Sequence, residues 1–243
     1  MPSMSCNHKE IRRFYDTVYH KNARLPGNVS WHLRRLARRL GPWEGRQLLD
    51  VGCGTGEWLK AAAEHGAISA GIDISQVAID LCQQALPKAE LHCGPAEALP
   101  FENKRFDVIS CLGSLEHFLD PKAALREMVR VAKIDATFLL LVPNAGFLPR
   151  RVGLYRGTQQ KDIHEEVRTL AGWQTLFESA GLRVARCWRD LHVLSRSWIV
   201  RGNWYFWPIR VAQALALPFW PLSCQYQVYY LCKLKHLPQR WTF

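Results

Sequence analysis

One segment, Leu48–Leu59 (LLDVGCGTGEWL), limits what this chain can fold into more than any other. Its apolar start, Leu48–Val51, indicates a strand that is buried on both faces of a parallel sheet. Three glycines at alternate positions follow, and the apolar spacing of a helix begins near Glu57. Glycine lets backbone N–H groups approach a ligand closely, so a strand, a glycine loop and a helix in this order are typical of a nucleotide-type cradle. An ordinary turn is the alternative.

The spacing of the glycines and two carboxylates narrow the choice of ligand. The loop reads G-x-G-x-G, which differs from the dinucleotide pattern G-x-G-x-x-G and from the triphosphate loop G-x-x-x-x-G-K-[ST]. Asp50 places a carboxylate beside the loop, where it would repel phosphate and suit a cation. Asp73 ends the next apolar strand, 68–74, and lies 17 residues after Gly56. A carboxylate there can accept both hydroxyls of a ribose; a helix cap is the alternative. Together these features favour S-adenosylmethionine, which carries an ammonium and a sulfonium group and no phosphate.

The chain continues as an alternation of strands and helices. After the first two strands, apolar runs predict strands at 91–93, 106–111, 137–142 and 182–188, and helical spacing predicts helices at 76–85, 121–133 and 171–180. This order is typical of a doubly wound α/β sheet, which binds ligands at the carboxyl ends of its strands.

Composition sets the remaining bounds. A chain of 243 residues has room for one α/β domain and an added lid. Its 32 basic and 21 acidic residues give a net charge of +11, which predicts attraction to nucleic acid, a membrane surface or a phosphorylated substrate. The eight cysteines form no C-x-x-C pair, so we expect reduced thiols in a cytoplasmic protein and no metal site. Neither a secretory signal nor a membrane-spanning segment is predicted.

By these motifs the region 45–190 resembles the class I S-adenosylmethionine-dependent methyltransferases. LLDVGCGTGEWL resembles the first motif of the family, GIDIS its acidic second strand, and AEALPFENKRFDVIS its third and fourth strands. SLEHFLDP and a later Pro-Asn resemble the ubiquinone-pathway O-methyltransferases and enzymes acting on bacterial glycans and natural products.

The resemblance implies a fold and a set of cofactor contacts. The expected fold is a doubly wound, seven-stranded, mostly parallel Rossmann-like α/β sheet with an N-terminal helical cap and a C-terminal insertion. Asp73 would hold the ribose, Ile74 would pack on the adenine, and the backbone of Ala96 would edge the base. The full set of expected cofactor-binding residues is Asp50, Gly52, Cys53, Gly54, Gly56, Asp73, Ile74, Ala96, Glu97 and Leu112.

Three departures from the family pattern stand out. Pro95 replaces an aspartate that often contacts the adenine amine, and Ile134-Asp135-Ala136 replaces a Pro-Gly-Gly turn. Gly113 replaces the first glutamate of a Glu-x-x-Glu-His pattern that accompanies a divalent metal in the ubiquinone enzymes, so no metal is predicted.

The expected organisation has four parts. Residues 1–45 form a helical cap, 46–190 the methyltransferase core with a lid at 143–169, 191–222 an aromatic insertion, and 223–243 a closing strand and tail. The closing strand, 227–234, is expected to be antiparallel at the edge of the sheet. Tryptophans and arginines alternate in the insertion, which is typical of a membrane-seating hairpin. A lid or a dimer surface is the alternative, and the oligomeric state is left open.

The predicted function is methyl transfer from S-adenosylmethionine to a small-molecule, lipid-linked or glycan-linked acceptor, at a hydroxyl oxygen. A hydroxyl gains from a base, and His117 and His164 are the two candidates. The expected location is cytoplasmic, with an anionic membrane surface as a further candidate partner. The alternatives are a soluble N- or C-methyltransferase, an RNA methyltransferase and a cofactor-binding protein without activity. Nucleic acid is not favoured, because the basic residues are dispersed and no N-P-P-Y-type tetrapeptide occurs.

Overall fold

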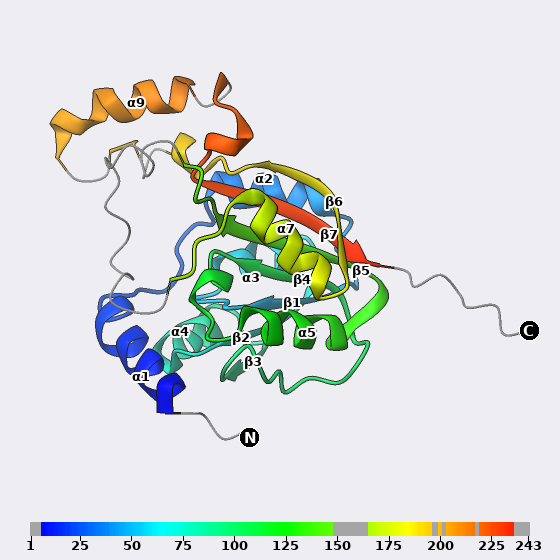
Figure 1. Ribbon diagram of the computed structural model, residues 1–243. Coiled ribbons are helices and arrows are strands. Elements are labelled where there is room, and N and C mark those ends of the chain that lie inside the picture. The colour runs from blue at the N-terminus through cyan, green and yellow to red at the C-terminus, as the bar shows by residue number, and fades with distance from the viewer. Residues whose placement is uncertain (1–5, 148–164, 196–198, 201–202, 217–218, 236–243) are drawn as a thin grey trace, which may run out of the picture.

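The computed structural model describes residues 6–147, 165–195, 199–200, 203–216 and 219–235. Seven strands form one sheet in the order β3-β2-β1-β4-β5-β7-β6 (Figure 1). The strands are β1 (Gln47–Val51), β2 (Ile68–Asp73), β3 (Glu90–Cys93), β4 (Phe106–Leu112), β5 (Ala132–Pro143), β6 (Leu182–Arg189) and β7 (Gln227–Leu234). The neighbouring pairs from β3 to β5 are parallel, and β7 is antiparallel to both of its neighbours. The predicted mostly parallel, seven-stranded sheet is confirmed.

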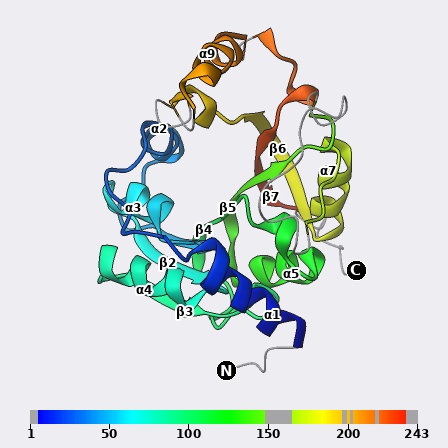
Figure 2. The same cartoon turned by 90° about the vertical axis from the view of Figure 1, so that its left-hand side faces the viewer.

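Helices cover both faces of the sheet (Figure 2). On one face β1, β4 and β5 pack against α5 (Pro121–Val131) and α7 (Leu170–Ser179). On the other they pack against α2 (Trp31–Leu40), α3 (Glu57–Ala63) and α4 (Gln76–Ala85). Successive strand residues alternate between the two faces, so Leu49 and Val51 belong to the first core and Leu48 belongs to the second.

The position of β7 differs from the prediction. The strand is antiparallel, as expected, but it pairs with β5 on one side and β6 on the other, so β6 forms the edge of the sheet. Buried side chains on both sides of β7, such as Tyr229 and Tyr230, suit an interior strand.

The seven cysteines with described side chains are free thiols.

Local capping explains where the helices begin. The hydroxyl of Ser75 accepts a hydrogen bond from the Ala78 N–H, and the Asp120 carboxylate accepts one from the Ala123 N–H ahead of Pro121. Helix α4 therefore has the predicted bounds. Helix α5 ends at Val131 rather than near Lys133, because Ala132 already pairs with Phe106 at the start of β5.

Two N-terminal helical segments flank the sheet. Helix α1 (Cys6–Phe14) continues into a π-helical turn, η1 (Tyr15–Tyr19), and both lie at the side where α4 begins (Figures 1 and 2). Helix α2 packs its leucines on α3 and exposes Arg34, Arg35, Arg38 and Arg39.

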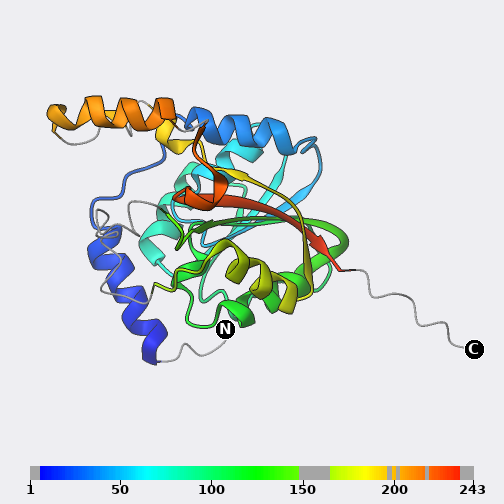
Figure 3. The same ribbon diagram turned by 45° about the horizontal axis from the view of Figure 1, so that its top comes forward.

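The segment between β6 and β7 holds η4 (His192–Leu194), η5 (Trp204–Phe206), α9 (Trp207–Ala216) and η7 (Leu222–Cys224). Helix α9 extends outward from the body of the molecule (Figures 1 and 3). Apolar side chains on and beside it are exposed, including Trp204 at 74%, Leu215 at 70% and Phe219 at 89%. Within the described ranges, no helix combines the length and the apolar character that crossing a membrane requires.

Candidate active site

The glycine loop after β1 has the backbone conformation that only glycine adopts easily. Gly52 and Gly54 have φ values of +76° and +53°. A Cβ on Gly52 would lie 2.5 Å from the Ser114 side chain, so this glycine lets the loop approach the end of β4. A Cβ on Gly54 would meet no protein atom within 4 Å, so this part of the loop faces open space. The loop is thus anchored at Gly52 and leaves room for a ligand at Gly54.

Asp73, at the end of β2, is held rigidly beside that open space. Its Oδ2 accepts a 2.8 Å hydrogen bond from the Gly54 N–H, and its Oδ1 accepts a 2.9 Å hydrogen bond from the Ser75 N–H. Burial raises the pKa of this carboxyl, and the two amides oppose that rise. Each oxygen keeps a further lone pair, so the group can accept hydrogen bonds from a diol while its position stays fixed.

These groups line a cavity of about 400 Å³, which we call the loop cavity. Its walls come from the glycine loop, the ends of β2 and β4, the segment after β3, and the N-terminal helical turn. Among the described residues, the walls contain no lysine or arginine, while Asp73, Glu57 and Glu97 supply carboxylates. A wall with this charge favours a cationic or neutral ligand over a phosphate.

Most of the predicted cofactor-binding residues lie in the loop cavity. They are Gly52, Cys53, Gly54, Asp73, Ile74, Ala96, Glu97 and Leu112. The carboxylate of Glu97 also accepts from the Asp120 N–H and lies 3.4 Å from His8 Nε2.

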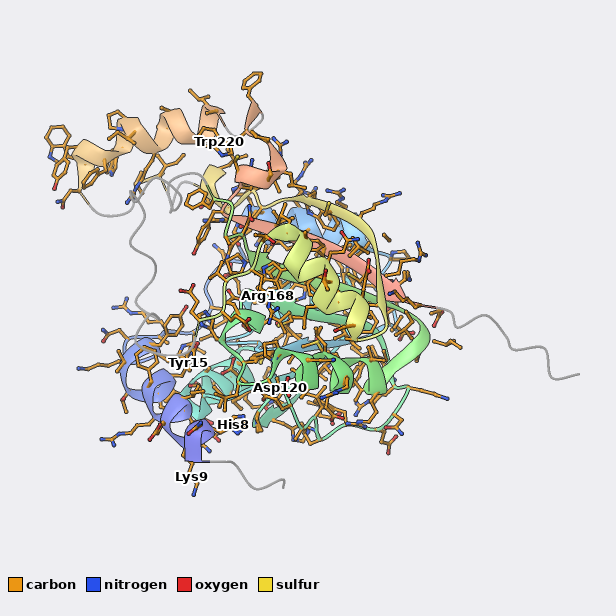
Figure 4. All side chains as sticks on the ribbon, in the orientation of Figure 1. His8, Lys9, Tyr15, Asp120, Arg168 and Trp220 are labelled. Carbon is orange, nitrogen blue, oxygen red and sulfur yellow. The ribbon has the colours of Figure 1, made fainter. Side chains whose placement is uncertain are left out.

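The N-terminal segment, predicted as a helical cap, closes one side of the loop cavity with residues that the sequence analysis did not name. Tyr15, Tyr19 and His20 line it. The Asp16 carboxylate accepts from the Ser75 hydroxyl at 2.7 Å, which ties η1 to the start of α4. Figure 4 shows Lys9 pointing away from the body of the molecule, whereas His8 lies on the side that faces it. The helical spacing of Tyr15 and Tyr19 is the sequence signal for an aromatic face on this segment.

Asp50 and Gly56, the other two predicted cofactor-binding residues, do not line the loop cavity. They line a second cavity, on the α2 side of the loop. The Asp50 carboxylate accepts a 2.6 Å hydrogen bond from the Ser110 hydroxyl, which itself accepts from Trp58 Nε1 at 2.9 Å. Burial raises the pKa of Asp50 to about 7. Residues alternate across a strand, so Asp50 faces the same side of the sheet as Leu48, which packs with α2 and α3.

The second cavity, of about 300 Å³, shares five residues with the first: Gly52, Cys53, Thr55, Glu57 and Leu112. The two cavities therefore meet across the glycine loop. The far wall of the second cavity holds His32 from α2, with Asp190 and His192 from the end of β6. We call it the His192 cavity. The sequence analysis missed these three residues; the short spacing of Asp190 and His192 directly after a strand was the signal.

Of the two predicted bases, His117 lines the loop cavity and His164 lies outside the described residues. His117 is buried, with its Nε2 3.9 Å from Glu116 Oε1. Burial raises the pKa of Glu116 to about 8, and the Oε2 of this residue has no hydrogen-bond partner among the described residues. In the same part of the chain, no three His, Cys, Asp or Glu side chains are grouped to hold a metal ion.

The comparisons with known proteins agree with this geometry. Residues 49–140 match the model of the methyltransferase domain family. The ubiquinone biosynthesis O-methyltransferase of Coxiella burnetii is 33% identical over 108 residues, which cover 43% of this chain and 46% of the relative. The demethylmenaquinone methyltransferase of Staphylococcus aureus is 29% identical over 161 residues, covering 61% of this chain and 66% of the relative. The chain thus spans about half the length of the first of these relatives.

The chain contains a class I S-adenosylmethionine-dependent methyltransferase domain. Its fold is also that of the geranyl diphosphate C-methyltransferase of Streptomyces coelicolor, with a TM-score of 0.68, 11% identity and coverage of 96% of this chain and 100% of that one. The predicted family and fold class are confirmed.

The methyl donor of this family fits the loop cavity of the domain. Gly54 leaves space where a Cβ would project, and Asp73 presents two fixed acceptor oxygens beside it. The carboxylates and the absence of lysine and arginine among the described wall residues suit a ligand that carries a sulfonium and an ammonium.

Proposed function

We propose that this protein transfers the methyl group of S-adenosylmethionine to a hydroxyl oxygen of a small or lipid-linked acceptor. The observation that carries this proposal is the loop cavity. There the glycine loop, the fixed Asp73 carboxylate, which can accept hydrogen bonds from a ribose, and an acidic wall lie together. One relative is named an O-methyltransferase of ubiquinone biosynthesis, which supports an oxygen acceptor. A second is named a methyltransferase of demethylmenaquinone, which supports a lipid-linked acceptor but names no acceptor atom.

Different residues of the domain would contact different parts of the donor. Asp73 would accept the ribose hydroxyls, Ile74 and Ala96 would contact the adenine, and the loop backbone at Gly52–Gly54 would hold the methionine end. The donor supplies an electrophilic methyl group when bound. The protein then has to align an acceptor oxygen with it and exclude water, and the cap formed by Tyr15 and Tyr19 serves the second need.

A binding titration and a transfer assay test the proposal. We expect S-adenosylmethionine to bind in isothermal titration calorimetry, and we expect label from S-adenosyl-[methyl-³H]methionine to enter a lipid extract or a catechol. ATP, with its triphosphate, should not bind. Lack of S-adenosylmethionine binding would refute the whole proposal. Label that enters only amines or carbon would refute the oxygen acceptor and favour an N- or C-methyltransferase.

We further propose that the acceptor is held at an anionic membrane surface, which α9 contacts. Trp204, Phe219 and their apolar neighbours are exposed on the part of the chain that extends outward. Exposed aromatic side chains that are grouped in this way partition into the interface of a bilayer. The exposed arginines of α2 lie along the same upper side of the molecule as α9 (Figures 1 and 3), and they would attract anionic headgroups.

Vesicle flotation measures this contact. The protein should float with vesicles of phosphatidylcholine and phosphatidylglycerol, less with phosphatidylcholine alone, and less at high salt. The triple variant Trp204→Ser, Trp207→Ser, Phe219→Ser should bind vesicles at least about 1,000-fold more weakly, because each aromatic group contributes about 1.5–3 kcal/mol when it leaves water. Ile134→Ser removes an apolar side chain that is 72% exposed on β5 and serves as the control. Equal flotation of both variants would refute the membrane contact.

A further inference from the structure

The His192 cavity lies against the glycine loop, and the residues expected to bind the donor form only one side of it. Five residues of the loop region belong to both cavities, so a molecule in the second cavity would reach the same loop from the opposite side. A reaction between two ligands requires this arrangement, in which each ligand has its own walls and the two meet at a shared boundary.

The far wall of this cavity carries a histidine–carboxylate pair. The imidazole Nδ1 of His192 hydrogen-bonds to Asp190 Oδ2, and the His192 backbone N–H donates to Asp190 Oδ1 at 3.1 Å. Asp190 is only 7% exposed, so its carboxylate is fixed by both contacts and largely shielded from water. A carboxylate on Nδ1 selects the tautomer that carries its proton there, which makes Nε2 the basic nitrogen.

A second histidine, from a distant part of the chain, faces the same cavity. His32 Nδ1 is buried and has no hydrogen-bond partner among the described residues, while its Nε2 lies 3.4 Å from the Ser30 hydroxyl. Burial lowers the pKa of His32, and the carboxylates of Asp190 and Glu57 oppose this shift. A buried polar atom without a partner costs free energy unless a ligand or water pairs with it.

The remaining walls describe the ligand. Leu33, Leu141, Trp58 and Tyr229 give the cavity an apolar and aromatic lining, and Tyr229 is fixed by stacking on Trp188. His32, Asp190 and His192 add polar groups to this lining. Such a pocket suits a flat, apolar body with a hydroxyl group at one end, as in a phenol or a quinol.

On these grounds we propose that the His192 cavity binds a phenolic acceptor and that His192, oriented by Asp190, is the general base for its methylation. The inference rests on the proposed function. In the step, the acceptor oxygen gives its proton to His192 Nε2 and forms a bond to the methyl carbon, while the carbon–sulfur bond breaks and its electron pair stays on sulfur. The products are the methyl ether, S-adenosylhomocysteine and a proton that His192 returns to water.

Several titratable groups face His192 from other elements. Asp190 at the end of β6, His32 on α2, Glu57 on α3, Asp50 on β1 and Tyr229 on β7 line the same cavity, and the ring of Tyr226 lies 6.4 Å from the ring of His192. The charge of Asp190 also acts on His32.

The test uses 4-methylcatechol as the probe, with S-adenosylhomocysteine for binding and labelled S-adenosylmethionine for turnover. Saturation-transfer NMR should show the probe bound to the wild type. His192→Gln should lower kcat on the order of 100- to 10,000-fold while the affinity for S-adenosylhomocysteine stays within about twofold. Turnover of this variant should recover toward alkaline pH, where the phenol ionises without help.

Two variants separate a base from a structural role. Asp190→Asn should reduce kcat less than His192→Gln, and imidazole ¹⁵N shifts should show that the Nδ1–H tautomer is lost. The matched control is His92→Gln, because His92 also contacts a carboxylate (Glu90 Oε1 at 3.3 Å) but lies on β3, at the opposite edge of the sheet. Its turnover should equal that of the wild type.

The outcomes are distinct. A wild type that fails to bind S-adenosylhomocysteine refutes the proposed function itself. A second outcome is that S-adenosylhomocysteine binds but 4-methylcatechol accepts no label. This outcome refutes the proposed acceptor site, whether or not 4-methylcatechol binds. If His117→Gln abolishes turnover and His192→Gln does not, the base is His117, as the sequence predicted, and the present inference is wrong.

Discussion

Asp73→Ala should weaken the binding of S-adenosylmethionine by about 100- to 1,000-fold in calorimetry. The variant removes both acceptors for the ribose hydroxyls, and hydrogen bonds to a charged group contribute about 1.5–3 kcal/mol each. It also leaves the Gly54 and Ser75 N–H groups without the carboxylate that now accepts from them.

Asp73→Asn should be almost as damaging, and this makes the test specific. Each carboxylate oxygen accepts from a backbone N–H, so either orientation of an asparagine amide would place its NH₂ group against a donor. Asp80→Asn, on the exposed face of α4, is the control and should bind S-adenosylmethionine like the wild type. Affinity within threefold of the wild type in Asp73→Asn would show that this carboxylate does not hold the ribose.

Gly54→Ala should cause a similar loss of cofactor binding, on the order of 100-fold, by a different mechanism. The new methyl group would enter the loop cavity, because no protein atom lies within 4 Å of that point. It would displace the ligand from the loop backbone while leaving Asp73 in place.

Gly45→Ala is a matched control for the backbone strain. Gly45 has φ of +69°, close to the +53° of Gly54, and it also has open space at its Cβ, but it lies in the turn before β1. Both substitutions should cost about 1–2 kcal/mol of folding stability in denaturant titrations. Only Gly54→Ala should lose cofactor affinity, so equal affinities would contradict the role assigned to Gly54.

Local chemistry made the fold and much of the donor site predictable. Helix α4 was predicted with the bounds that it has, because its cap, Ser75, and the proline that follows its end are read from neighbouring residues alone. The same holds for Gly52, Gly54 and Asp73, whose positions in the wall of the loop cavity follow from a strand, a loop and the next strand.

The features that could not be predicted from the sequence depend on long-range packing. Asp50 lines the His192 cavity rather than the loop cavity, and this depends on which face of the sheet each helix covers. His32 and Asp190 lie in one cavity although α2 and the end of β6 are far apart in the chain. The order of the last two strands brings them together, since β6 lies outside β7 and Arg39 of α2 stacks over Trp188 of β6. No periodicity within either segment carries that information.

The antiparallel return of β7 has a consequence for how such a protein can diversify. The chain leaves β6 at Asp190 and re-enters the sheet at Gln227, and the Asp190 N–H hydrogen-bonds to the Gln227 carbonyl at 3.4 Å. Both ends of the intervening segment are therefore pinned together beside the His192 cavity. Exchange of this segment would leave the hydrogen bonds of Asp73 to Gly54 and Ser75 unchanged, provided that the new segment keeps the carbonyl groups that accept from Asn144. Evolution, or recombination in the laboratory, can thus change the methyl acceptor while keeping the methyl donor, by replacing only the segment between Asp190 and Gln227.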